Sequence, residues 1–369
     1  MEIKVSFPHM GNSYIAFRGL VAALGCTPVI PDRPNSKTVK EGSKVSPEAI
    51  CFPFKINMGD FLNAFEKGTQ VLVMVTGVGP CRFGYYGELQ EKILRSMGYD
   101  FEIYIINQNS IVDIIKRLRE MLGHKGFYRK FWRALRTLVN KSKTAHMIER
   151  MARETRCYEV NKGETTKVMN QCLQLVDQAK TFREMKRARK KAIRMFREIQ
   201  VDKTRNPIKV AILGEIYVVV ESSINFSIEE LLGDMGVFVF QPSGLYEWLK
   251  HLVRLDFTAK KAVTLAKPYL KYTTGAKDQY TIGYTIKCSQ EGYDGVIHLY
   301  PFTCMPQTMA RTILDTVSRD YNIPVLNISL DEHSGEAGFL TRVEAFIDLL
   351  ERRRVQRMQK ASLLEARAI

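Results

Sequence analysis

The stretch VIHLYPFTC, residues 296–304, ends an apolar run with a cysteine, and the stretch VLVMVTGVGPC, residues 71–81, does the same. After each cysteine a helical pattern leads to another strand, which begins 18 residues beyond Cys81 (99 − 81) and 19 residues beyond Cys304 (323 − 304). Short apolar runs followed by helices are typical of buried parallel strands. The two cysteines therefore occupy equivalent strand-to-helix junctions, and the second half of the chain repeats the architecture of the first.

Strand and helix patterns alternate outward from these two junctions. The pattern predicts strands at 1–7, 27–31, 69–76, 99–107, 206–217, 237–242, 295–302 and 323–330. It predicts helices at 13–25, 51–68, 82–98, 226–236, 245–255, 306–321 and 341–354, and a polar loop at 35–49. Strands that alternate with helices form parallel sheets covered on both faces. We therefore expect an α/β fold of two related Rossmann-like (flavodoxin-like) parallel-sheet lobes.

The middle of the chain differs from both halves. From about residue 110 to 206 it favours helix and is rich in lysine and arginine, which predicts a basic helical insertion or a bridge between the lobes. We expect a first lobe at 1–110 carrying Cys51 and Cys81, a basic helical segment at 111–206, a second lobe at 207–355 carrying Cys304, and a C-terminal tail at 356–369.

Composition limits the class of protein. With 369 residues and 45% hydrophobic residues, the chain can bury substantial cores. It has no run of about eighteen uncharged apolar residues, and MEIKVSFPHM begins like a strand, so we expect a cytoplasmic protein without a membrane span. Seven cysteines without a secretion signal indicate reduced thiols or metal ligands. The net charge of +16 is compatible with nucleic acid, anionic substrates or an acidic partner.

The cysteines at the junctions are candidates for chemistry. Ligands of an open parallel sheet bind at the carboxyl ends of its strands, and a helix N-terminus favours thiolate and can stabilise an anionic iron–sulfur cluster. Cys51 is a third cysteine at a predicted helix start, and it shares a Cys-x-Pro pattern with Cys304. Three thiolates from three loops could hold one cluster, with one iron left open or bound by a non-cysteine ligand. The alternative is that each cysteine only packs as a small apolar residue.

The other four cysteines lack such positions. Cys26 follows a helix end, Cys157 and Cys172 lie in the helical middle, and Cys288 lies in a helix-like stretch, so we expect packing or surface roles. No Cys-x-x-Cys pair occurs, which removes the local signatures of zinc ribbons, thioredoxins and ferredoxins. Any cluster must therefore be assembled by the fold.

Acidic residues follow a predicted strand at the same carboxyl side as the cysteines. Within LDEHSGEAGF, residues 330–339, the candidates are Asp331, Glu332, His333 and Glu336. A carboxylate or the imidazole could be the fourth iron ligand, a proton donor or a partner of a ligand. The alternative is that these side chains only cap a solvated turn.

Three charged residues flank the cysteines in sequence: Glu48, Arg82 and Arg311. The two arginines could donate hydrogen bonds to cluster sulfur or balance its charge. They could equally be surface cations at helix starts.

Five segments together resemble a known family. They are EAICFPFK (48–55), GVGPCRFGYYGELQ (77–90), GEIYVVVESSINFSIEELLGDMG (214–236), YPFTCMPQTMA (300–310) and LDEHSGEAGFLTRVEAF (330–346). The chain is similar to the 2-hydroxyacyl-CoA dehydratase D-component-related proteins, also called acyl-CoA dehydratase activase-related or CoA protein activase proteins, from about residue 1 to 355. The resemblance implies two related α/β lobes with a 4Fe-4S cluster held by Cys51, Cys81 and Cys304 in the cleft between them.

The same resemblance implies an activity and a partner. In the true dehydratases such a cluster gives an electron to an acyl-CoA thioester, and a separate ATP-dependent activase with its own iron–sulfur cluster supplies that electron. The chain has no G-x-x-x-x-G-K-[ST] loop, so ATP hydrolysis is expected of the partner. We expect a dehydratase-like or reductase component acting on an acyl-CoA or another small substrate, as a homodimer or as a heterodimer with a related subunit.

Two alternatives remain open at this point. The first is a non-catalytic iron–sulfur protein for electron transfer or for maturation of a partner. The second is a basic nucleic-acid-binding protein, for which YRKFWRALRTLVNKSK (128–143) and KRARKKAIRMFR (186–197) supply clustered cations. No nucleic-acid-binding motif supports the second alternative, and apolar residues recur at helical spacing beneath the charges.

Overall fold

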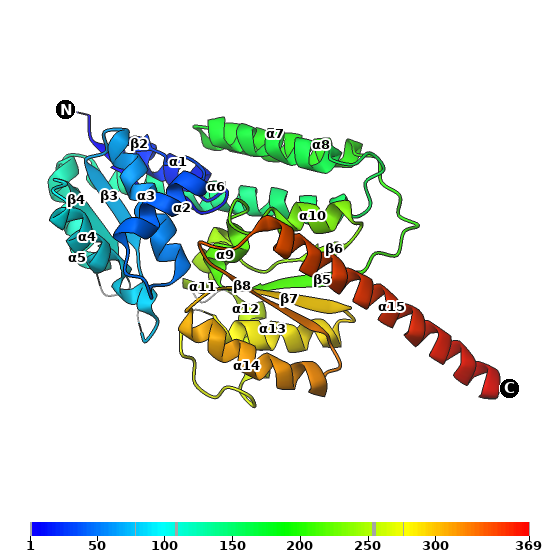
Figure 1. The fold of residues 1–369 in the computed structure, drawn as a ribbon. Coiled ribbons are helices and arrows are strands. Elements are labelled where there is room, and N and C mark those ends of the chain that lie inside the picture. Colours follow the sequence, from blue (N-terminus) through cyan, green and yellow to red (C-terminus); the bar gives the residue numbers. More distant parts are fainter. Residues whose placement is uncertain (1, 78, 108–109, 253–255, 276, 369) are drawn as a thin grey trace.

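The computed structural model of the chain describes residues 2–77, 79–107, 110–252, 256–275 and 277–368. It contains two four-stranded sheets, each entirely parallel and surrounded by helices (Figure 1). The predicted α/β class with two parallel-sheet lobes is confirmed.

The two sheets have the same strand order. The first contains β1 (Lys4–Ser6), β2 (Thr27–Val29), β3 (Val71–Val75) and β4 (Glu102–Ile106) in the order β2-β1-β3-β4. The second contains β5 (Lys209–Gly214), β6 (Phe238–Phe240), β7 (Gly295–Pro301) and β8 (Val325–Leu330) in the order β6-β5-β7-β8. In this flavodoxin-like order the direction of winding reverses between the first and third strands, and ligands bind at the carboxyl ends there.

The helices surround the sheets in chain order. Around the first sheet are α1 (Tyr14–Leu24), α2 (Ser36–Val45), α3 (Phe52–Glu66), the 3₁₀ turn η1 (Arg82–Tyr85) and α4 (Tyr86–Ser96). The basic segment forms α5 (Ile111–Leu122), α6 (Phe127–Arg156), α7 (Glu164–Gln178) and α8 (Phe182–Glu198). The remaining helices are α9 (Ile216–Val220), α10 (Ile228–Asp234), α11 (Leu245–Leu252), α12 (Phe257–Ala266), α13 (Asp278–Gln290), α14 (Met305–Asp320) and α15 (Glu336–Ala368). Residues 253–255 of the predicted helix 245–255 lie outside the described residues.

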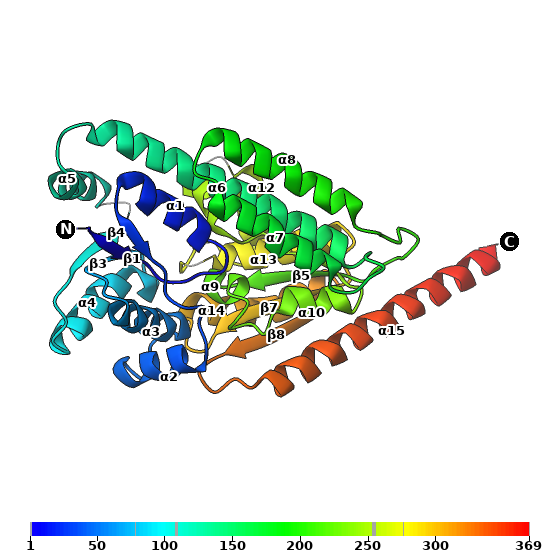
Figure 2. The ribbon, with the colours of Figure 1, turned by 90° about the horizontal axis from the view of Figure 1, so that it is seen from above.

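The basic helices pack against both lobes (Figure 2). Leu138 of α6 packs with Ala16 of α1 and with Leu245 of α11, so α6 contacts elements on both sides of the segment. Helix α8 turns an apolar face toward α6 and α7, formed by Met185, Ala188, Ala192 and Phe196. Its lysines and arginines therefore lie on the other faces, as expected for an amphipathic helix.

The prediction of a polar loop at 35–49 is wrong over most of that range, because Ser36–Val45 form helix α2. Asn35 caps this helix by accepting hydrogen bonds from the backbone of Lys37 and Thr38, and the Thr38 side chain completes a capping box. Gly42 of α2 and Gly59 of α3 let the two backbones touch. The polar composition hid a helix that is stabilised by its cap and by one close helix–helix contact.

Gly42→Ala is expected to lower the free energy of unfolding by about 1–3 kcal/mol. A Cβ at this position would overlap the backbone carbonyl of Lys55, which cannot move without shifting α3. Urea unfolding measures the change. Gly338→Ala in α15 is the matched control, because a Cβ there meets nothing and should stabilise the helix by up to about 1 kcal/mol. Equal effects of the two substitutions would show that the α2–α3 contact is loose.

The C-terminal helix α15 begins against the second sheet and then extends away from the body (Figures 1 and 2). Phe339, Val343, Phe346, Ile347 and Leu350 pack into the core of the second lobe. Across the described part of the chain, no helix combines the length and apolar character that crossing a bilayer requires.

Candidate functional site

Each of the three candidate cysteines is the N-cap residue of a helical element, with extended backbone. Cys51 caps α3, Cys81 caps η1 and Cys304 caps α14. Pro53 and Pro306 occupy the first turns of the two α-helices, as the Cys-x-Pro pattern predicts. The helix predicted at 82–98 differs at its start, because the four residues of η1 separate Cys81 from α4. Two of the three thiols thus lie at α-helix N-termini.

The thiols of Cys81 and Cys304 both have a raised pKa. Cys51 and Cys304 are buried and Cys81 is partly exposed. Burial raises the pKa of the Cys304 thiol strongly, and the negative charges of Glu215, Cys51 and Cys81 raise it further. Burial also raises the pKa of Cys81, with contributions from Cys51 and Glu215. The structure therefore brings these cysteines from two lobes into one neighbourhood, together with a carboxylate.

Arg82 ties the three cysteine loops together. Its Nη1 donates to the backbone carbonyl of Ala49 at 2.7 Å, and its Nη2 donates to the backbone carbonyl of Thr303. Ala49 precedes the first cysteine by two residues, Thr303 comes directly before the third, and Arg82 directly follows the second. Thr303 has a φ of +63°, uncommon for a β-branched residue, and the hydrogen bond from Arg82 helps to hold its carbonyl in place.

Arg82→Lys is expected to increase local opening of the Cys304 loop about tenfold, because one ammonium cannot span both carbonyls and a charge-assisted hydrogen bond is worth about 1.5–3 kcal/mol. The readout is the rate at which a thiol reagent modifies Cys304 in the metal-free protein, followed by mass spectrometry. Arg311→Lys, on the exposed face of α14, is the control and should leave the rate unchanged. An unaltered rate in the Arg82 variant would mean that this arginine does not hold the loop.

Glu215 is a site residue that the residue pattern did not single out. It follows β5 directly, and its backbone N–H donates to the carbonyl of Leu299 in β7 at 3.0 Å. Its Oε2 accepts hydrogen bonds from the backbone N–H groups of Tyr217 and Val218 at 3.0 and 3.1 Å. The strand predicted at 206–217 runs past Glu215, whereas β5 ends at Gly214, so the residue pattern did not place this carboxylate at the carboxyl edge of the sheet.

Tyr86 and the loop before α13 complete the surroundings of the thiols. Burial, followed by the neighbouring Cys51 thiol, raises the pKa of Tyr86 well above its usual value, so its hydroxyl stays protonated and can donate. Gly275 lies directly on Cys81, because a Cβ there would be 2.9 Å from the Cβ of the cysteine. Lys277 follows in the same loop, and the charges of Glu247, Asp256 and Glu215 favour its protonated form against the effect of burial, which lowers its pKa.

The acidic candidates after β8 lie in a different place. Glu332 forms an ion pair with Lys55 of α3, and the Asp331 carboxylate accepts from the backbone N–H of His333 and from the Ser334 hydroxyl. A groove of about 650 Å³ beside α2 is lined from the β8–α15 loop by Asp331, Glu332, His333 and Ser334. Glu336 is exposed at the start of α15. Among the described residues, no hydrogen bond or ion pair joins this loop to the three cysteines, but Lys55, the partner of Glu332, lies four residues after Cys51.

Two further candidates are exposed. Glu48 lies in the loop before Cys51, and Arg311 lies on α14. The Arg311 charge contributes to the lowered pKa of the buried His298, after the larger effect of burial. Of the three flanking charged residues, Arg82 is the one that contacts two cysteine loops.

The remaining cysteines are buried inside the lobes and the helical segment. Burial raises the thiol pKa of Cys157 and Cys172 to about 11 and that of Cys288 to about 12. Cys26 also packs in an apolar cluster. Cys26, Cys172 and Cys288 pack in apolar clusters, in agreement with the packing role predicted from sequence.

Cysteine thiols are the usual ligands of iron–sulfur clusters, so the residues at this junction have the chemistry of such a ligand set. Within the described ranges, no three His, Cys, Asp or Glu side chains lie close enough together to hold one ion. A four-iron cluster is wider than an ion, so its ligands lie farther apart, and its ligands are mainly cysteine thiolates. Three thiols with two hydrogen-bond donors, Arg82 and Tyr86, match this chemistry.

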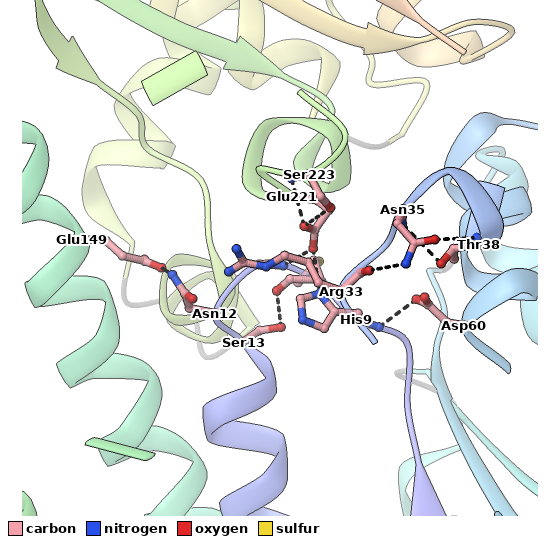
Figure 3. A network of polar contacts seen from close by, with 12 residues as sticks. His9, Asn12, Ser13, Arg33, Asn35, Thr38, Asp60, Glu149, Glu221 and Ser223 are labelled. Atoms are coloured by element: carbon pink, nitrogen blue, oxygen red, sulfur yellow. Dashed lines mark hydrogen bonds and ion pairs between the residues drawn. The ribbon is translucent and has the colours of Figure 1, made fainter. Parts of the chain in front are cut away.

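A second polar network joins the two lobes through buried groups (Figure 3). His9, after β1, contacts Glu221 after α9 with its Nδ1 at 2.9 Å from Oε2, and its backbone N–H donates to Asp60 at 2.9 Å. Glu221 also accepts from the backbone N–H of Gly11 and from the Ser223 hydroxyl, both at 2.6 Å. Burial would raise the pKa of Glu221, but the hydrogen bonds, His9 first, lower it to about 2. The network therefore holds an ionised carboxylate between the lobes.

Comparison with known protein families confirms the resemblance that the sequence motifs indicate. A family model described as 2-hydroxyglutaryl-CoA dehydratase, D-component, matches residues 18–350, nearly the whole chain. A search of curated proteins found no match.

Proposed function

Since the chain belongs to the 2-hydroxyglutaryl-CoA dehydratase D-component family, we propose that it is an iron–sulfur protein of low-potential electron transfer. Cys51, Cys81 and Cys304 hold a 4Fe-4S cluster. The observation that carries this proposal is the junction of the three cysteine loops, which come from two lobes and are joined by Arg82.

The residues of the chain shape the environment of such a cluster. When bound, the cluster supplies a one-electron donor whose potential depends on hydrogen bonds, charge and exposure. Arg82 holds the loops in register and places a positive charge beside them. The Tyr86 hydroxyl is protonated and available to a cysteine sulfur. Burial of Cys51 and Cys304 keeps water away from two of the three ligands.

The electron comes from a separate ATP-dependent activase in this proposal, and the acceptor is an acyl-CoA or another small molecule. The support is the family membership together with the absence of a G-x-x-x-x-G-K-[ST] loop in the sequence. The reaction is then of the dehydratase or reductase kind.

The test is anaerobic purification and reconstitution, followed by measurement of iron, acid-labile sulfide and the EPR spectrum after reduction. About four irons per chain and the signal of a reduced cubane are expected. A protein that stays free of iron after reconstitution would contradict the proposal and leave the thiols as packing residues.

One observation favours a second candidate, a non-catalytic electron-transfer or maturation protein. In the described part of the chain, the acid–base candidates Glu332, His333 and Glu336 form no hydrogen bond or ion pair with the three thiols, and Glu332 is engaged by Lys55. Turnover separates the two: the cluster-loaded protein is mixed with an ATP-dependent reductant and a panel of 2-hydroxyacyl-CoA thioesters. Substrate-dependent oxidation of the cluster indicates the enzyme, and oxidation by protein partners alone indicates the carrier.

A further inference from the structure

We infer that the protein binds a free amino acid, a small zwitterion, in a polar pocket where the two lobes meet the helical segment. The pocket has a volume of about 210 Å³. A single buried water needs about 10–15 Å³, so this space admits a molecule of several heavy atoms. None of the described residues next to Cys51, Cys81 or Cys304 lines it, so the inference does not rest on a cluster.

All three parts of the chain line this pocket. From the first lobe come Asn12, in the loop after β1, and Arg33, in the loop after β2. The helical segment contributes Arg153 and Arg156 of α6, and the second lobe contributes Gln241 directly after β6. The loops of both lobes therefore follow the carboxyl ends of strands, where open parallel sheets bind their ligands.

Two arginines of α6 carry buried positive charge at this pocket. Arg153 is 6% exposed and Arg156 is 3% exposed. Among the described residues, the Arg156 side chain donates to neutral oxygens, the Thr166 hydroxyl at 3.2 Å and the backbone carbonyl of Glu229 at 3.3 Å. Arg153 Nη1 lies 3.3 Å from Oε2 of Glu229, longer than the about 2.7–2.9 Å of a charge-assisted hydrogen bond. Buried charges are normally paired, so one carboxylate for two guanidinium groups leaves positive charge for an anion.

The side chain of Arg156 is held in position by α10. A Cβ at Gly233 would lie 2.3 Å from Cδ and 2.6 Å from Cγ of Arg156. The arginine therefore passes directly over the backbone of α10, at a point where a larger residue would displace it. A guanidinium group fixed in this way loses little conformational freedom when a ligand binds.

Carboxylates line the same pocket as the arginines. Glu149 of α6 and Glu230 of α10 form no ion pair in the described part of the chain. Glu149 Oε1 accepts a hydrogen bond from Nδ2 of Asn12 at 2.8 Å, and Figure 3 shows the Arg33 guanidinium extending toward both residues. Burial raises the pKa of Glu149 and the charge of Arg153 opposes this, so a further cationic group would favour the ionised form.

Unpaired charges of both signs around one space match a zwitterion. The carboxylate of an amino acid is complementary to Arg156 and to Arg33, which is exposed at the rim and forms no ion pair with any described residue. The ammonium group is complementary to Glu149 and Glu230. A phosphate or a dicarboxylate would satisfy the arginines but would place further negative charge beside these acidic side chains.

Thermal unfolding and isothermal titration calorimetry of the purified chain test the inference, with the standard amino acids added one at a time. At least one should raise the unfolding midpoint by several degrees and bind with a dissociation constant below about 1 mM. Removing one charge of that amino acid, by N-acetylation or by conversion to the amide, should weaken binding at least about tenfold. Inorganic phosphate and succinate should bind no better than these derivatives.

Two substitutions test whether the ligand lies in this pocket. Arg33→Gln changes an exposed side chain, so the fold should survive, and Glu149→Gln keeps the oxygen that accepts from Asn12. Each should weaken binding about tenfold, because each removes one charge that faces the ligand. Arg150→Gln is the matched control on α6, because Arg150 is exposed, pairs with Glu154 and does not line the pocket. This variant should bind as the wild type does.

Three results would overturn the inference. The first is the absence of any heat of binding or midpoint shift with every standard amino acid at about 10 mM. The second is phosphate or succinate binding as tightly as the best amino acid, since the acidic side chains would then have no role in recognition. The third is unchanged binding in both Arg33→Gln and Glu149→Gln, which would place the ligand outside this pocket.

Discussion

Cys304→Ser is expected to reduce bound iron from about four atoms per chain to below about one, the largest single effect that we anticipate. In the proposed cluster the Cys304 thiolate is a ligand, and a buried serine hydroxyl does not ionise to replace it. The fold should survive, because serine is a favourable N-cap residue for α14. Iron and sulfide analysis with the EPR spectrum gives the result, and circular dichroism checks the fold.

Cys26→Ser is the matched control for this substitution. Cys26 is also buried, but it packs in an apolar cluster of the first lobe and does not contribute to the raised pKa of any proposed ligand. This variant should keep its iron and lose only stability. A Cys304→Ser protein with the iron content and spectrum of the wild type would remove this cysteine from the ligand set.

Glu221→Gln is expected to lower the free energy of unfolding by about 3 kcal/mol, because folding favours the ionised form of a carboxylate whose pKa is about 2, against an ordinary value of 4.5. The side chain is fully buried, and the substitution leaves His9 facing a neutral amide between the lobes. Urea unfolding near neutral pH measures the loss. Glu120→Gln, an exposed carboxylate on α5, should change stability by less than about 0.5 kcal/mol.

The pH dependence of stability provides the second readout for Glu221. Its pKa is about 2 in the folded protein, against an ordinary value of 4.5, so its stabilisation is complete above pH 4.5 and is lost as the pH falls toward 2. The difference between the wild type and Glu221→Gln should shrink by about 3 kcal/mol over that interval. A difference that stays constant down to pH 2 would show that the carboxylate is not held ionised by His9.

The features that could be predicted from sequence are those that local patterns encode. The repeated run of strand, cysteine and helix at 71–81 and 296–304 predicted two parallel-sheet lobes, and the structure and the family match agree. Apolar runs and helical spacing arise within about twenty residues, so a linear pattern reports them. The Cys-x-Pro pattern likewise marked the starts of α3 and α14.

The features that could not be predicted depend on contacts between distant residues. Arg82 and Thr303 are 221 positions apart, and no local pattern shows that one would donate to the other. The pairing of Lys55 with Glu332 spans 277 positions and engages a carboxylate that looked free in the sequence. Helix α2 was mistaken for a loop because Gly42 and Gly59, each unremarkable alone, create its contact with α3.

The distribution of the three cysteines along the chain has a consequence for biosynthesis. Two of them lie in the first lobe, and the third follows 223 residues later (304 − 81), after the helical segment and most of the second sheet. Domains fold in order as they emerge from the ribosome, so the first lobe forms while Cys304 has not yet been translated. A nascent chain therefore exposes only two of the three thiols. If the three cysteines hold the cluster proposed above, its insertion must wait until the second lobe has emerged, which makes it a late step of maturation.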